Sequence, residues 1–177
     1  MRILVDQVTE SPKSLRFAEG MEELNRVEGD RSLHEFRFPP SVDVNLVFYR
    51  CGRDILFRGS LQGVIGGCCS RCLEPYSFGV EKNFEFVLVP ELTETDRKKE
   101  LNKEEMEISF YQGAEINLAP LIREQVLLAL PIRPLCTENC RGLCAGCGVN
   151  LNEESCLCSA PEADERLGVF RSLRLNR

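Results

Sequence analysis

Several residue types and patterns on which common functions depend are absent from this chain. Its 177 residues include no tryptophan and one histidine, and aromatic residues make up only 7% of them. A core must therefore be built mostly from Leu, Val, Ile and Phe, for which the apolar fraction of 43% is sufficient. No segment approaches the roughly 20 apolar residues that a membrane-spanning helix needs, so we expect no association with a membrane.

A basic excess, which is typical of proteins that coat nucleic acid, is also missing. The formal net charge is −6 and the pI is near 5.0. Because a dedicated nucleic-acid binder replaces the counterions on phosphates with Lys and Arg, this charge argues against simple RNA coating. A local basic face remains compatible with it.

The patterns that indicate an enzyme are absent as well. The sequence contains neither G-x-x-x-x-G-K-[ST] nor G-x-G-x-x-G, and the single histidine, His34, belongs to no visible Ser–His–Asp arrangement. We therefore predict that the protein is not an enzyme and has no small-molecule substrate. The first residues show neither the positive region nor the apolar stretch of a signal sequence, so we expect a cytoplasmic protein.

Cysteine, in contrast, is abundant, with ten residues. In a cytoplasmic protein, clustered thiols usually bind metal or carry out redox chemistry. Six of them form the run Cys136-x3-Cys140-x3-Cys144-x2-Cys147-x8-Cys156-x-Cys158. Thiolates suit zinc, which prefers four ligands in a tetrahedron. This run therefore predicts a thiolate metal site.

We predict one structural zinc ion at this site. The pair Cys144 and Cys147, followed by Gly148, has the pattern of a zinc knuckle, in which glycines let backbone amides turn toward the sulfurs. The asparagines that follow favour turns, so the chain can fold back and bring a second pair to the ion. The predicted ligands are Cys144, Cys147, Cys156 and Cys158.

Other assignments of these thiols stay open. Cys136 and Cys140 compete for the same ion, because their spacing also suits chelation. Free reduced thiols, an iron–sulfur cluster or a redox disulfide pair are the alternatives to zinc.

A second C-x-x-C pair, Cys69 and Cys72, follows a predicted strand. Thioredoxin-like motifs begin a helix, whereas another strand follows here, so redox catalysis is disfavoured. A knuckle-shaped turn, with or without metal, is the main interpretation, and a zinc ribbon completed with Cys144 and Cys147 is the alternative. A reversible disulfide between Cys69 and Cys72 would make the protein a thiol-based redox or stress sensor.

Apolar periodicity predicts an α+β fold with an antiparallel β-rich body. Residues 42–48 alternate apolar and polar side chains, as a half-buried strand does, and 55–66 and 77–89 are expected to continue an antiparallel meander. Asn117 is a plausible N-cap for an apolar helix at about 118–130, packed against the body.

We divide the chain into a β-rich body at 1–135, a zinc-binding module at 136–160 and a basic amphipathic tail at 161–177. Residues 91–107 are rich in carboxylates and are expected to be a solvated linker. The tail has no acidic residue after Glu165, and its arginines alternate with apolar residues. They are predicted to contact nucleic-acid phosphates, the alternative being a helix packed on the body. These arginines are Arg166, Arg171, Arg174 and Arg177.

Three pieces of the sequence together resemble one family. They are Cys69-Ser70-Arg71-Cys72-Leu73-Glu74-Pro75, Leu127-Leu128-Ala129-Leu130-Pro131, and the run from Cys136 to Asn152 with Cys140-Arg141-Gly142-Leu143-Cys144 and Cys147-Gly148 inside it. These pieces look like the YceD family, bacterial and plastid proteins linked to accumulation of large-subunit ribosomal RNA. The resemblance covers roughly residues 40–175.

The resemblance implies a non-catalytic role in making or stabilising the large-subunit (23S) ribosomal RNA. The implied partners are ribosomal RNA, a pre-ribosomal particle or a large-subunit ribosomal protein. A zinc-dependent protein-interaction module is the alternative that involves no RNA.

Overall fold

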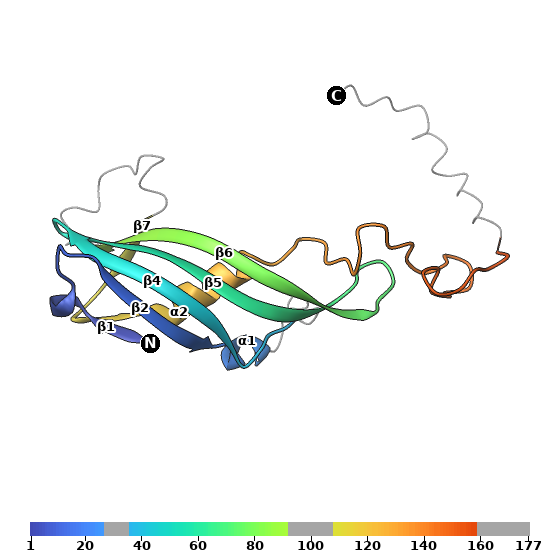
Figure 1. The fold of residues 1–177 in the computed structure, drawn as a ribbon, viewed down its shortest axis with the longest axis horizontal. Coiled ribbons are helices and arrows are strands. Elements are labelled where there is room, and N and C mark those ends of the chain that lie inside the picture. Colours follow the sequence, from blue (N-terminus) through green and yellow to red (C-terminus); the bar gives the residue numbers. More distant parts are fainter. Residues whose placement is uncertain (27–35, 92–107, 159–177) are drawn as a thin grey trace, which may run out of the picture.

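The computed structural model describes residues 1–26, 36–91 and 108–158 (Figure 1). The tail with Arg166, Arg171, Arg174 and Arg177 lies outside the described residues, and so does the predicted linker beyond residue 91. The elements, in chain order, are β1 Arg2–Leu4, η1 Val5–Gln7, β2 Lys13–Gly20, α1 Glu22–Asn25, β3 Phe36–Arg37, β4 Ser41–Cys51, β5 Asp54–Cys68, β6 Pro75–Pro90, β7 Ile108–Tyr111, β8 Glu115–Asn117 and α2 Leu118–Leu127.

The body is a six-stranded sheet with the order β2-β4-β5-β6-β7, to which β3 adds by pairing with β5. The predicted β-rich body is confirmed, and β4, β5 and β6 form the predicted antiparallel meander. The sheet is not wholly antiparallel, because the edge strand β7 pairs parallel to β6. A parallel neighbour needs a long connection rather than a hairpin, and the acidic segment between the two strands provides that length.

Strand β2 was not predicted, and its inward-facing residues explain why. It pairs antiparallel with β4 along its whole length, but its most deeply buried side chain is the carboxylate of Glu19, which is 5% exposed. Arg123 of α2 donates to Glu19 at 3.4 Å, so the charge is paired where it is buried. A carboxylate at an inward position breaks the apolar alternation by which a strand is recognised.

Helix α2 covers one face of the sheet (Figure 1). The Asn117 side chain accepts a hydrogen bond from the Ala119 N–H at 3.2 Å, so the predicted N-cap is confirmed. The helix ends earlier than the predicted residue 130, at Leu127. Its side chains Leu118, Ile122 and Val126 are buried in a core shared with β4, β5 and β6. No helix in the described part of the chain is long and apolar enough to cross a membrane.

The cysteine-rich segment lies beyond one end of this sheet. After α2, the chain runs past the turn between β5 and β6, which projects from the same end (Figure 1). We call residues 69–74 the hairpin turn and residues 131–158 the arm. Both contain cysteines, and they meet at the end of the body.

Candidate metal centres

The structure gathers eight of the ten cysteines into two groups of four. Within each group, all sulfurs lie within 4.8 Å of one another. The distal cluster consists of Cys144, Cys147, Cys156 and Cys158, all in the arm. The proximal cluster consists of Cys69, Cys72, Cys136 and Cys140, and it joins the hairpin turn to the arm. Four thiolates around one point are a donor set that zinc binds as a tetrahedron.

In the distal cluster, Cys144 and Cys147 lie in a tight turn that Cys156 and Cys158 approach from the end of the arm. The Cys156 thiol lies 3.2 Å from the Cys144 sulfur. The Gly146 N–H donates to the Cys144 sulfur at 3.4 Å. A Cβ at residue 146 would lie only 3.2 Å from the Cys158 Cβ, so a side chain there would crowd the cluster.

In the proximal cluster, the sulfurs meet across two pairs that are remote in sequence. Cys69 Sγ lies 3.7 Å from Cys140 Sγ, and Cys72 Sγ lies 3.7 Å from Cys136 Sγ. A disulfide would need a sulfur–sulfur distance of about 2.05 Å, so these thiols are in contact without being bonded.

The first cysteine of each C-x-x-C pair has a lowered pKa. Burial raises the pKa of Cys69, but hydrogen bonds from the backbone N–H groups of Cys72, Cys136 and Arg71 outweigh burial and bring that pKa to about 6. The backbone N–H of Cys147 is the main cause that lowers the pKa of Cys144 to about 6. Backbone amides therefore stabilise a thiolate, the form that binds metal, in each cluster.

Cys72 and Cys158 hold their protons more tightly. Burial raises the pKa of Cys72 to about 12, and hydrogen bonding to Cys147 raises the pKa of Cys158 to about 12. In each cluster, the closely packed sulfurs cannot all lose their protons, because neighbouring thiolates repel one another. A bound cation would offset this repulsion and allow all four to be deprotonated.

Solvent exposure distinguishes the two clusters. In the proximal cluster, Cys69 is 0% exposed, and Cys72 and Cys140 are each 3% exposed. In the distal cluster, Cys147 and Cys158 are exposed. Thiol–disulfide exchange requires an accessible sulfur. The burial of Cys69 and Cys72 therefore disfavours the redox-sensor alternative.

Backbone contacts also hold the arm to the hairpin turn. The Ser70 N–H donates to the Pro134 carbonyl at 2.8 Å, and the Leu143 N–H donates to the Arg71 carbonyl at 3.1 Å. The Arg71 guanidinium donates to the Cys140 carbonyl at 2.8 Å. The arm thus docks on the turn along its length and not through sulfur alone.

Asn152, which lies between Cys147 and Cys156 in the chain, contacts the proximal cluster, a role that the sequence did not reveal. Its Nδ2 donates to Cys140 Sγ at 3.2 Å, and its Oδ1 accepts from the Arg141 N–H at 2.8 Å. The turn that follows the distal knuckle therefore places a hydrogen-bond donor on a sulfur of the proximal cluster. Such donors orient ligands and stabilise their charge.

The four predicted zinc ligands are brought together as one group. The predicted competition from Cys136 and Cys140 is not found, because their sulfurs lie with those of Cys69 and Cys72. For the same reason, Cys69 and Cys72 do not complete a ribbon with the distal knuckle. Cys72 and Cys136 are separated by 64 positions in the chain, and Cys69 and Cys140 by 71. Local cysteine spacing does not predict contacts over such separations.

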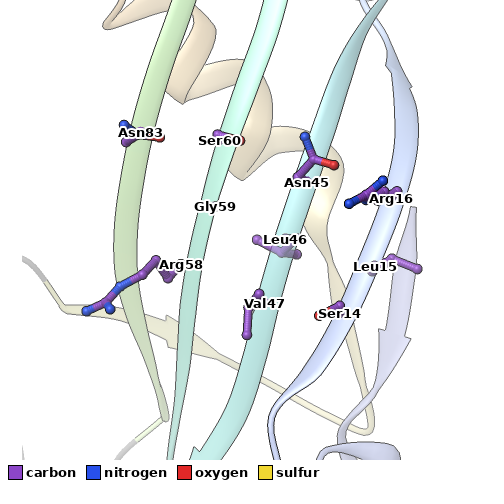
Figure 2. A pocket seen from close by; sticks show the side chains of 10 residues that line it. All are labelled: Ser14, Leu15, Arg16, Asn45, Leu46, Val47, Arg58, Gly59, Ser60 and Asn83. Atoms are coloured by element: carbon purple, nitrogen blue, oxygen red, sulfur yellow. The ribbon is translucent and has the colours of Figure 1, made fainter.

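Away from the clusters, the sheet carries a shallow depression of about 500 Å³ on the face opposite α2. Figure 2 shows it between β2, β4, β5 and β6, with Arg16, Asn45, Ser60 and Asn83 around it. Among the ten residues that line it there is no carboxylate, histidine or cysteine. The depression therefore lacks the usual groups for general acid–base catalysis.

Comparison with protein families shows a family to which the chain is similar. The model of the family described as "Large ribosomal RNA subunit accumulation protein YceD" matches residues 57–174, which are well over half of the chain. The matched region contains β6, α2 and both cysteine clusters. No solved structure matches the chain.

Individual relatives agree with the family match. "Large ribosomal RNA subunit accumulation protein YCED homolog 1, chloroplastic" of Arabidopsis thaliana is 28% identical over 158 residues, which are 77% of this chain and 49% of that protein. The protein of the same name from Zea mays is 28% identical over 146 residues, 69% of this chain and 49% of that protein. An uncharacterised protein of Mycobacterium tuberculosis (strain ATCC 25618 / H37Rv) is 30% identical over 113 residues, 64% of this chain and 53% of that protein. The chain spans about half the length of these curated relatives.

Proposed function

Because the chain belongs to the YceD family of large ribosomal RNA subunit accumulation proteins, we propose that it supports the accumulation or assembly of large-subunit (23S) ribosomal RNA. Its partner would be ribosomal RNA, a pre-ribosomal particle or a large-subunit ribosomal protein. We predict that it acts in the cytoplasm. The observation that supports a binding role is the distal cluster, a compact thiolate module presented at the end of the body.

The proposal includes one structural zinc ion in the distal cluster. Four sulfurs lie within 4.8 Å of one another, and two belong to a knuckle whose glycine lets backbone N–H groups approach the sulfur. Zinc supplies no redox chemistry, and it would fix the end of an arm that contributes nothing to the main core of the body. The residues that would hold it are Cys144, Cys147, Cys156 and Cys158.

The proposed role is not enzymatic. The lining of the depression in Figure 2 offers no usual acid–base pair. A factor that binds and stabilises an assembly intermediate needs no such pair.

Measurement of ribosomal RNA in cells tests this function. Depletion of the protein should lower the ratio of mature 23S to small-subunit ribosomal RNA, and the wild-type chain should restore it. A chain with Cys144→Ser and Cys147→Ser should fail to restore the ratio, because the module loses its ion. Cys51→Ser is the matched control, since Cys51 is exposed and outside both clusters. An unchanged ratio after depletion would reject the ribosomal role, and rescue by the double variant would show that the ion of the distal cluster is dispensable.

Direct contact with RNA is assigned to the basic tail, which lies outside the described residues. Removal of residues 166–177 should weaken co-sedimentation with pre-ribosomal particles. For every phosphate that the tail no longer neutralises, the magnitude of the log–log salt slope should fall by about 0.7–0.9. If the truncated chain stays folded and keeps the salt profile of the full chain, the RNA-binding surface lies elsewhere and a protein partner is favoured.

A further inference from the structure

We propose that the proximal cluster, Cys69, Cys72, Cys136 and Cys140, binds a second zinc ion that fastens the arm to the hairpin turn. The inference concerns residues other than the predicted ligands and does not rest on the ribosomal role. It follows from three independent features of the cluster: the backbone of its C-x-x-C turn, the arrangement of its sulfurs and its position in the fold.

The turn at Cys69 repeats the hydrogen-bond pattern of the distal knuckle. The Cys69 N–H donates to the carbonyl five residues later, at 2.9 Å, and the Cys144 N–H does the same at 2.8 Å. The N–H four residues after each of these cysteines donates back to its carbonyl at 2.9 Å. The N–H two residues after each donates to its sulfur, at 3.5 Å in the first turn and 3.4 Å in the second. The two turns therefore have the same backbone hydrogen bonds, including one that a backbone N–H donates to the first sulfur.

The residue after the second cysteine of this loop adopts an unfavourable backbone conformation. Gly148 has a φ of +76°, and its counterpart in the first turn, Leu73, has a φ of 61°. Leucine rarely adopts this left-handed conformation. Leu73 is 62% exposed, so burial of its side chain does not compensate the strain. Such strain persists where the surroundings determine the backbone, as a metal held by both cysteines of the turn would do.

The sulfur positions match a single tetrahedral ion. Zn–S bonds of about 2.3 Å place the ligands of a tetrahedron about 3.8 Å apart. The two sulfur–sulfur distances across the cluster are each 3.7 Å. An iron–sulfur cluster distributes its thiolates over several irons, which separates the sulfurs more widely. The set therefore fits one ion, and four thiolates favour zinc.

Two clusters also imply two ions. Zinc takes four ligands, and each cluster provides four sulfurs within 4.8 Å of one another. Each cluster combines one C-x-x-C knuckle with a second pair, which has three residues between its cysteines in the proximal cluster and one in the distal cluster. The proximal ion would be the more enclosed of the two, since three of its four ligands are buried.

The position of the proximal cluster indicates what the ion does. It lies between the hairpin turn and the arm, where Cys72 meets a cysteine 64 residues later in the chain. A cross-link that closes so long a loop removes much of the freedom of the unfolded chain. The second zinc ion would therefore fix the arm, and the distal module on it, to the body.

Metal content of purified full-length variants tests the proposal. The wild-type chain, prepared under reducing conditions, should contain two zinc ions and no iron by elemental analysis. Cys72→Ser with Cys136→Ser should reduce zinc from two ions to one, and so should Cys147→Ser with Cys158→Ser. The control Cys51→Ser should keep two. A wild-type measurement avoids misfolded variants: titration of the metal-free chain with Co²⁺ should raise the thiolate charge-transfer absorption until two equivalents are bound.

The alternative outcomes are distinct. One zinc ion in the wild type that only the Cys147 and Cys158 variant removes would overturn the second site. Iron in place of zinc, or a Cys69–Cys72 disulfide under reducing conditions, would overturn it as well. Loss of zinc only from the Cys72 and Cys136 variant would support the second site and reject the distal ion of the proposed function.

Discussion

At the scale of single residues, the two knuckles differ most at the position that follows the second cysteine. Gly148 adopts its positive φ without a steric cost, whereas Leu73 adopts a similar one with a Cβ that opposes it. The Leu73 side chain is largely exposed and covers no part of the main core. Leu73 therefore occupies the position equivalent to Gly148 with a strained backbone.

We predict that Leu73→Gly stabilises the protein. The left-handed conformation costs a non-glycine residue about 1–2 kcal/mol, and the extra entropy that glycine loses on folding offsets about 0.5–1 kcal/mol of the gain. The free energy of unfolding in urea should rise by about 0.5–1 kcal/mol with unchanged metal content. Ile132→Gly is the control, because Ile132 is fully exposed and has no positive φ. It should be neutral or destabilising, and an equal gain in both variants would refute the strain at Leu73.

At the scale of structural elements, the arm depends on a close approach to the hairpin turn. Gly142 has a φ of +73°, and a Cβ there would lie 3.0 Å from the Arg71 carbonyl oxygen. Gly113 has a similar φ of +77°, but a Cβ there would meet nothing within 4 Å. Substitutions at the two glycines therefore distinguish the energetic cost of the positive φ, which both share, from the cost of a clash with the hairpin turn, which only position 142 has.

We predict that Gly142→Ala weakens the docking of the arm, whereas Gly113→Ala does not. Both variants should lose about 1 kcal/mol of stability, because alanine disfavours a positive φ. Only Gly142→Ala should also speed the transfer of zinc to a competing chelator, since it pushes the arm away from the hairpin turn. Equal rates of zinc transfer in the two variants would show that the arm tolerates displacement.

The same elements show how far the sequence alone leads. The grouping of the four distal cysteines and the Asn117 cap were predicted because each depends on residues close together in the chain. The proximal cluster was not, because its two halves belong to a hairpin and an arm that meet only in the folded protein. Strand β2 was missed because Glu19 occupies a buried position, where its partner Arg123 lies 104 residues away. Local patterns do not contain such long-range pairs.

At the scale of the whole molecule, the body and the arm rely on different interactions. All buried residues of the main core lie between Ile3 and Val126, and none comes from the arm. A separate small cluster of buried residues consists of Cys69, Cys72 and Cys140. Burial of apolar side chains therefore stabilises the body, whereas the arm is held by contacts of its cysteines with those of the hairpin turn and by hydrogen bonds to that turn.

Removal of metal should therefore loosen the arm and spare the body. An excess of chelator should leave the strand signal in the circular dichroism spectrum and the cooperative unfolding of the body largely unchanged. The exposed Arg141, which is followed by Gly142, should become a rapid site of trypsin cleavage. Loss of the strand signal together with the metal would show that the sheet itself depends on the ions.

X-ray absorption at the zinc edge of the wild-type chain tests the central claim most directly. If both clusters bind zinc, every ion has the same ligand type, and the average shell should contain four sulfurs at about 2.3 Å with no nitrogen or oxygen. Together with two zinc ions per chain, this result would assign all eight clustered cysteines as ligands. A shell with fewer than four sulfurs, or with nitrogen or oxygen ligands at about 2.0–2.2 Å, would contradict the assignment.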